Sequence, residues 1–150
     1  MAGSFVCIYA HIVFSTKGRA PLLSEDIRAC VWEYSGGILR NHGCVPIKIG
    51  GMADHVHVLV ELAKDRTAPD VVRDLKSNSS RWIRSTFEGL SQFGWQQGYV
   101  AFSVGVNGLE RVSGYIAHQE EHHREKGFQE EFLDFLRRHG AKCDERYIWA

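Results

Sequence analysis

The stretch DHVHVLV, residues 54–60, is the part of this chain that most clearly indicates a fold. It is short, apolar and rich in valine, which is typical of a buried β-strand. Because side chains two positions apart on a strand point to the same side, His55 and His57 share one face and Val56 and Val58 share the other. The aliphatic face predicts contact with a core. The two imidazoles are left to face a different surface.

Apolar periodicity and turn signals on both sides of this stretch predict the remaining elements. We expect strands at 5–15, 45–49, 55–62 and 97–104, and helices at about 25–41, 69–87, 109–126 and 129–138. The two middle strands form a hairpin connected by residues 50–53. Strand, helix, hairpin, helix and strand in this order predict a ferredoxin-like (split βαβ) α+β fold, with an antiparallel sheet and two helices on one face. The additional helix that begins at Leu109 would cover the other face.

Length and charge limit the function classes. We expect one domain over residues 1–150, since no shift of composition suggests a second. The formal net charge is zero, which argues against a globally basic nucleic-acid binder. The charge is nevertheless uneven, because residues 64–84 carry an excess of three positive charges and residues 118–146 an excess of two negative charges. A local basic stripe of this kind is typical of a phosphate-binding surface, although many such helices only face solvent.

The N-terminal segment, the lack of long apolar runs and the spacing of the cysteines predict where in the cell the protein is located. No basic segment followed by an apolar run occurs at the start and no long apolar run occurs elsewhere, so we expect no signal peptide, no membrane span and a cytoplasmic protein. Cys7, Cys30, Cys44 and Cys143 are widely spaced, with no Cys-x-x-Cys pair. This pattern favours reduced, mostly packed thiols over a zinc site or a disulfide framework.

Polar residues on the predicted 109–126 helix form a second feature. Tyr115 and Gln119 are four positions apart and therefore share one helical face, with His122 one turn further on. A tyrosine four residues before a glutamine is common and carries little information by itself. Its value here is that this helix is expected to cover the strand face that presents His55 and His57.

Five segments in this order resemble the single-tyrosine HUH transposases, the small bacterial enzymes of insertion sequences and their relatives associated with repetitive extragenic palindromes. The segments are residues 9–17, 51–57, 75–81, 95–103 and 115–123. The resemblance implies that His55 and His57 bind a divalent ion and that Gln119 is the third protein ligand. It also implies that Tyr115 is the nucleophile.

The reaction implied by the resemblance is cleavage and rejoining of single-stranded DNA. Tyr115 would attack a phosphodiester, form a 5′-phosphotyrosine and release a 3′-hydroxyl, so that rejoining needs no nucleotide cofactor. Tyrosine is a weak nucleophile at neutral pH, and the sequence shows no dedicated base. The ion would polarise the phosphate oxygen. Two imidazoles alone would suit zinc, whereas the family implies Mg²⁺ or Mn²⁺.

The expected partners are single-stranded DNA with hairpin ends and a second copy of the chain. Candidate phosphate contacts lie on the basic 69–87 helix: Arg73, Lys76, Ser79, Ser80, Arg81 and Arg84. The apolar strand near 99–104 is expected at a sheet edge, where pairing of two copies would give a homodimer. In such a dimer Tyr115 could reach the partner's histidines, and the sequence leaves open whether one chain or two build each site.

Two other functions fit part of the sequence. A ferredoxin-like sheet can bind RNA on its open face without catalysis, but the aromatic signature of such modules is missing and histidines occupy the strand face. A metal-dependent hydrolase could use His55, His57 and His122 with water. That alternative has only Glu61 as a candidate base and gives Tyr115 no role.

Overall fold

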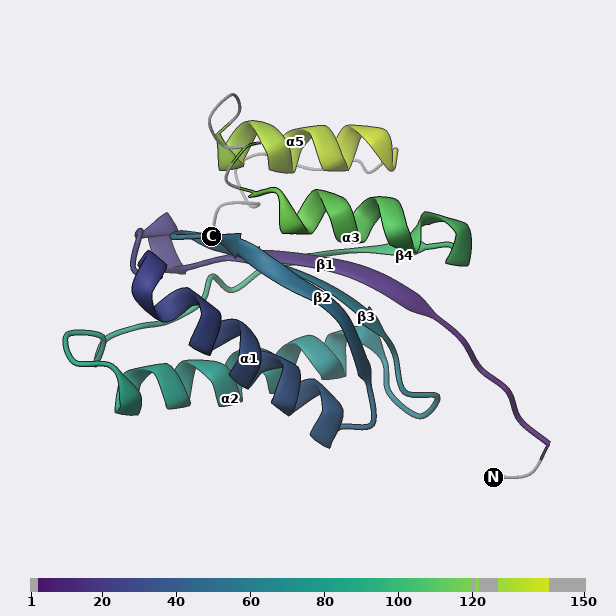
Figure 1. Ribbon diagram of the computed structural model, residues 1–150, viewed down its shortest axis with the longest axis horizontal. Helices are drawn as coiled ribbons and strands as arrows, with labels where there is room; N and C mark the ends of the chain where they lie inside the picture. Colours follow the sequence, from purple (N-terminus) through teal and green to yellow (C-terminus); the bar gives the residue numbers. More distant parts are fainter. Residues whose placement is uncertain (1–2, 120, 122–126, 141–150) are drawn as a thin grey trace.

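The computed structural model describes residues 3–119, 121 and 127–140. The order of the elements follows the sequence prediction, and the four strands form one antiparallel sheet in the order β2-β3-β1-β4 (Figure 1). The strands are β1 (Tyr9–Ser15), β2 (Val45–Met52), β3 (His55–Glu61) and β4 (Val100–Val104). The main helices are α1 (Glu25–Asn41), α2 (Ala68–Thr86), α3 (Leu109–Ala117) and α5 (Phe128–Arg138).

The helices lie in two layers, one on each face of the sheet. Helices α1 and α2 cover one face, and α3 and α5 lie on the other (Figure 1). The predicted α+β class with an antiparallel sheet is therefore confirmed, as is the expectation that the helix beginning at Leu109 covers the second face. Helix α5 also lies on this face of the sheet, a position that was not predicted from the sequence. The predicted edge position of the fourth strand is also confirmed.

The alternation along β3 separates a hydrophobic core from the candidate site. Val56 and Val58 pack with Ile12 and Phe14 of β1 against residues of α1 and α2, including Leu75. On the opposite face a smaller core joins the sheet to α5, and it consists of Val13, Phe128, Phe132 and Leu136, with Val100 and Phe102 packed against it. Burial of these apolar side chains fixes α5 above the central strands, because apolar area removed from water contributes roughly 25 cal/mol per Å².

The first two helices begin near the predicted residues. Thr67 caps α2 by accepting a hydrogen bond from the backbone N–H of Asp70 at 3.2 Å, and Pro69 is the second residue of the helix because Ala68 precedes it. Helix α1 begins at Glu25 as expected. The Tyr34 side chain of α1 is 39% exposed and stacks on Trp82 of α2 at 4.2 Å between ring centroids.

The hairpin differs from the prediction in a way that matters for the site. Strand β2 continues through Met52, so the connection is shorter than the expected 50–53 and Gly50 lies within the strand. A Cβ atom on Gly50 would lie 2.8 Å from both the Cγ2 atom and the carbonyl oxygen of Ile116. Glycine at this position therefore lets α3 approach the sheet backbone closely.

Several predicted boundaries are shifted. Strand β1 begins at Tyr9 rather than at residue 5, and β4 begins at Val100 rather than at residue 97. Helix α3 ends at Ala117 instead of near residue 126, and the Nδ1 atom of His118 lies 2.7 Å from the carbonyl oxygen of Gly114 at this end. His122 lies outside the described residues.

The exposure of the cysteines and the length and polarity of the helices can be compared with the predictions of packed thiols and no membrane span. Cys7 and Cys30 are exposed and Cys44 is buried, so only one of these three free thiols is packed as expected. Cys143 lies outside the described residues. No helix in the described part of the chain is both long and apolar enough to cross a membrane.

Candidate active site

His55 and His57 lie side by side in the interior, between the sheet and the helices above it. Both side chains are fully buried. The ring of Phe128 from α5 stacks on His55 at 4.3 Å, and the ring of Tyr115 from α3 meets His57 edge-on at 5.7 Å. The strand face that presents the two histidines is therefore covered by α3, as predicted, and also by α5.

A neighbouring side chain holds the Nδ1 atom of each imidazole. The Nδ1 atom of His55 lies 2.8 Å from the carboxylate oxygen Oδ1 of Asp54, and that of His57 lies 2.9 Å from Nε2 of His11. Burial, and then the neighbouring His57, lower the pKa of His11 to about 3, so His11 is neutral. When Nδ1 donates the hydrogen in each of these bonds, both Nε2 atoms keep their lone pairs.

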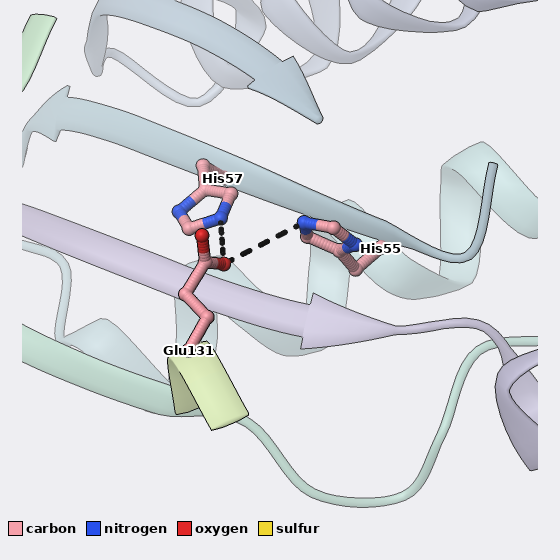
Figure 2. Close-up of side chains that lie close together, drawn as sticks. All are labelled: His55, His57 and Glu131. Atoms are coloured by element: carbon pink, nitrogen blue, oxygen red, sulfur yellow. Dashed lines mark hydrogen bonds and ion pairs between the residues drawn. The ribbon is translucent and has the colours of Figure 1, made fainter. Parts of the chain in front are cut away.

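The two Nε2 atoms point to a common space that also receives two oxygen atoms. The Oε1 atom of Gln119 lies 3.0 Å from Nε2 of His55, and the Oε1 atom of Glu131 lies 3.0 Å from Nε2 of His57. Glu131 extends from α5 to a position between the histidines, and its Oε1 atom is 3.7 Å from Nε2 of His55 (Figure 2). These four side chains come from three separate parts of the chain.

The donor atoms fit a divalent ion. One ligand atom each from His55, His57 and Glu131 lies within 4.8 Å of the other two. Ligand atoms about 2.1 Å from one ion are about 3.0 Å apart when their bonds are at right angles, as in an octahedral shell. The observed spacings of 3.0 and 3.7 Å are of this size. A cation would also satisfy the lone pairs of nitrogen and oxygen that face one another here.

Tyr115 belongs to the same group of side chains. Its hydroxyl donates a hydrogen bond to the second carboxylate oxygen, Oε2, of Glu131. Burial is the main cause that raises the pKa of Tyr115 above its usual range, and the negative charge of Glu131 adds to it. In this state the phenol keeps its proton, and the hydrogen bond fixes the direction of the hydroxyl.

Sequence reasoning missed His11 and Glu131. A signal for His11 was available, because alternation along the first strand places it on the same face as Val13, beside the histidine pair. A signal for Glu131 was also available, because it lies three residues after Phe128 and four before Phe135 and so borders the apolar face of α5, whereas Glu130 lies on the opposite face. In the structure Glu131 is 3% exposed and Glu130 is exposed.

The predicted phosphate contacts lie on α2, on the opposite face of the sheet from Tyr115 (Figure 1). The side chains of Arg73, Arg81 and Arg84 are exposed. Ser79 is 1% exposed, and its hydroxyl donates to the carbonyl oxygen of Leu75 and accepts from Nε1 of Trp95. Ser80 is also buried. The structure therefore brings none of these six residues to the histidine pair.

Lys76 has a defined structural contact. Its ammonium donates to the backbone carbonyls of Gln96, Gln97 and Gly98 at 2.8, 3.2 and 2.7 Å. Burial lowers the pKa of Lys76 to about 8. These bonds hold the segment before β4, which explains why the strand begins later than predicted.

Comparison with known proteins places this arrangement in a family. Residues 4–119 match the family model described as "Transposase IS200 like". The chain belongs to the IS200-like transposase family. It is 25% identical over 116 residues to the ISDra2 transposase TnpA of Deinococcus radiodurans, covering 74% of this chain and 83% of that protein. It is 30% identical over 125 residues to the IS200 transposase of Salmonella typhimurium, covering 77% and 78%.

Solved structures show the same fold. A crystal structure of a transposase from Deinococcus radiodurans superposes with a TM-score of 0.66 at 24% identity, covering 79% of this chain and 95% of that one. A REP-associated tyrosine transposase, solved bound to a REP hairpin, superposes with a TM-score of 0.60 at 13% identity, covering 82% and 73%. Glu131 and the rest of α5 lie beyond the segment that the family model matches.

Proposed function

We propose that this transposase is a metal-dependent enzyme that cleaves and rejoins single-stranded DNA through a 5′-phosphotyrosine on Tyr115. The observation that carries the proposal is the contact between the Tyr115 hydroxyl and Glu131, whose other carboxylate oxygen lies against His57. A nucleophile and a set of metal-binding atoms thus share one carboxylate within a single chain. A binding module without catalysis would not need this arrangement.

The proposed metal ligands are His55, His57, Gln119 and Glu131. Carboxylate and amide oxygens are typical ligands of Mg²⁺ and Mn²⁺, and Mn²⁺ also accepts imidazole, so we propose one of these two ions. When bound, the ion would polarise a phosphate oxygen and neutralise the charge that develops there. Asp54 and His11 would orient the two imidazoles.

The proposed reaction begins at the Tyr115 oxygen. This oxygen attacks phosphorus, the bond from phosphorus to the 3′-oxygen breaks, and the leaving 3′-oxygen takes up a proton. Glu131 accepts the hydrogen bond of the attacking hydroxyl and lies where it can receive the proton that the phenol loses. The phosphotyrosine keeps the energy of the phosphodiester, so attack by a 3′-hydroxyl rejoins the strand.

The proposed substrate is single-stranded DNA with hairpin ends. A REP-associated relative has been solved bound to a REP hairpin, which supports this class of ligand. Of the residues predicted on α2, the exposed Arg73, Arg81 and Arg84 are the best candidates for contacts to DNA away from the cleaved bond. Pairing of the β4 edges of two copies would give a homodimer with two complete sites. We place the enzyme in the cytoplasm, together with its DNA.

A covalent adduct tests this proposal. The protein is incubated with single-stranded hairpin DNA and Mn²⁺, and a protein–DNA band that survives denaturation is scored. Tyr115→Phe is expected to abolish the band while hairpin binding and folding remain, since only the attacking oxygen is lost. An adduct of undiminished yield from this variant, or none from the wild-type protein on any hairpin, would overturn the proposal.

A further inference from the structure

A cavity of about 870 Å³ lies beside Tyr115. It is lined by residues of β4, the short 3-10 helix at Val106–Gly108, α3 and α5. Its volume is within the range of cavities that hold small ligands, which is roughly 300–1,000 Å³. Tyr115 is part of its wall, so a group bound in this cavity would lie next to the nucleophile.

The described residues that line the cavity include basic side chains and no acidic one. The basic residues are Arg111, Arg138 and His139. Arg111 precedes Tyr115 by one turn of α3, and Arg138 follows Glu131 by two turns of α5, so both arginines lie on the helical faces that carry the site. Two guanidinium groups in a wall whose described residues carry no acid favour an anion, and a guanidinium matches the geometry of a phosphate.

Arg138 and the nucleophile Tyr115 both contact the ring of Phe135. The Cζ atom of Arg138 lies 5.7 Å from the ring centroid of Phe135, and this ring meets the Tyr115 ring edge-on at 5.5 Å. Both residues also line the cavity, so a phosphate bound by Arg138 there would lie on the side of the nucleophile.

The remaining wall suits a nucleobase. Phe102 and Phe135 line the cavity, and the His139 ring stacks on Phe102 at 3.8 Å. Aromatic faces bind bases of single-stranded DNA by stacking, without a sequence requirement. Cationic and aromatic surfaces thus occur together in a space of suitable size.

We propose that this cavity binds one nucleotide of the DNA strand next to the bond that Tyr115 cleaves, with its phosphodiester held by Arg111 and Arg138. This inference rests on the proposed strand cleavage and adds a binding site for the flanking nucleotide. Part of the cavity is built from α5, which lies beyond the segment matched by the family model.

The test measures binding of a fluorescent single-stranded oligonucleotide as a function of salt. Arg111→Gln with Arg138→Gln in one protein should lower the affinity and reduce the slope of log K against log salt by about 0.7, since both arginines hold one phosphate and each phosphate neutralised on a single strand contributes about 0.7. Arg137→Gln is the control for the replacement of Arg138, because Arg137 is its neighbour in sequence and pairs with Asp134 instead of lining the cavity. This control should keep the wild-type slope.

A second variant keeps the result interpretable if the double variant folds poorly. Arg111→Lys with Arg138→Lys retains both charges and should retain most of the slope. A slope equal to wild type in the folded Gln variant, or the same loss in Arg137→Gln, would overturn the proposed subsite. Adduct formation by the wild-type protein on the same oligonucleotide is scored in parallel, so failure of strand cleavage itself is distinguished from failure of the subsite.

Discussion

The Nε2 atom of His11 lies 2.9 Å from the Nδ1 atom of His57, and both side chains are buried. His11 stands in β1 and His57 in the neighbouring β3, so the bond crosses between two strands of the sheet. It fixes which nitrogen of His57 faces the site. His55 has the equivalent bond to Asp54, and the two contacts together direct both Nε2 atoms toward Glu131.

Replacement of His11 should weaken metal binding. His11→Phe keeps a flat ring but removes the acceptor for His57, and loss of such an orienting partner typically lowers metal affinity by about 10–100-fold. Titration calorimetry with Mn²⁺ measures this change. His11→Gln offers an amide oxygen as acceptor and should recover part of the affinity. Equal affinities of wild type and His11→Phe would show that His11 only fills space.

Glu131→Gln should reduce the stabilisation that Mn²⁺ gives the folded protein. An ion at 100 times its Kd stabilises the native state by about 2.7 kcal/mol, and a weaker site gives less at the same concentration. The measurement is the thermal midpoint with and without Mn²⁺. Glu130→Gln is the control, because Glu130 is the exposed neighbour on α5. Identical Mn²⁺ shifts in both variants would exclude Glu131 as a ligand.

Gly50→Ala should destabilise the fold by about 1–3 kcal/mol, because the added methyl overlaps Ile116 of α3. Denaturant unfolding gives this value. Gly37→Ala in the middle of α1 is the matched control, since a Cβ there meets nothing within 4 Å. It should stabilise the protein by about 0.4–1 kcal/mol through loss of backbone freedom in the unfolded chain. Equal stabilities of the two variants would show that a methyl group at residue 50 fits between β2 and α3 without a clash.

Lys76→Met should lower the unfolding free energy by about 1–3 kcal/mol, because three carbonyl groups lose a charged donor while the apolar stem is kept. The same denaturant experiment measures this loss. Hairpin binding across a salt series then separates the structural contact from the proposed DNA contact. An unchanged stability together with a salt slope reduced by about 0.7 would mean that Lys76 acts mainly on DNA.

Mixing inactive variants tests which chain supplies each part of the site. In this structure Tyr115, Gln119 and both histidines come from one chain. Tyr115→Phe mixed with His57→Ala should therefore remain inactive in adduct formation, even when heterodimers form. Recovery of activity on mixing would show that Tyr115 reaches the histidines of a partner, the arrangement that the sequence left open.

Local sequence patterns determined most of the framework. Alternation along residues 54–60 identified β3 and its two faces, and the caps and turns around α1 and α2 gave their boundaries to within about two residues. The family resemblance rested on five short segments, residues 9–17, 51–57, 75–81, 95–103 and 115–123, and it implied roles for His55, His57 and Tyr115. Such features depend on neighbours within a few positions, so they can be read without a structure.

Tertiary packing alone decided the rest. Glu131 enters the site because the apolar face of α5 packs on Val13. Helical periodicity places Glu131 beside that face, but only the docking of α5 on the sheet brings it to His55 and His57. Ser79, predicted as a phosphate contact, instead donates to Leu75 and accepts from Trp95, which is distant in the sequence. The identity of a side chain fixes which bonds it can form. Which partner it meets depends on contacts between segments far apart in the chain, and these exist only once the sheet and its two helical layers have assembled.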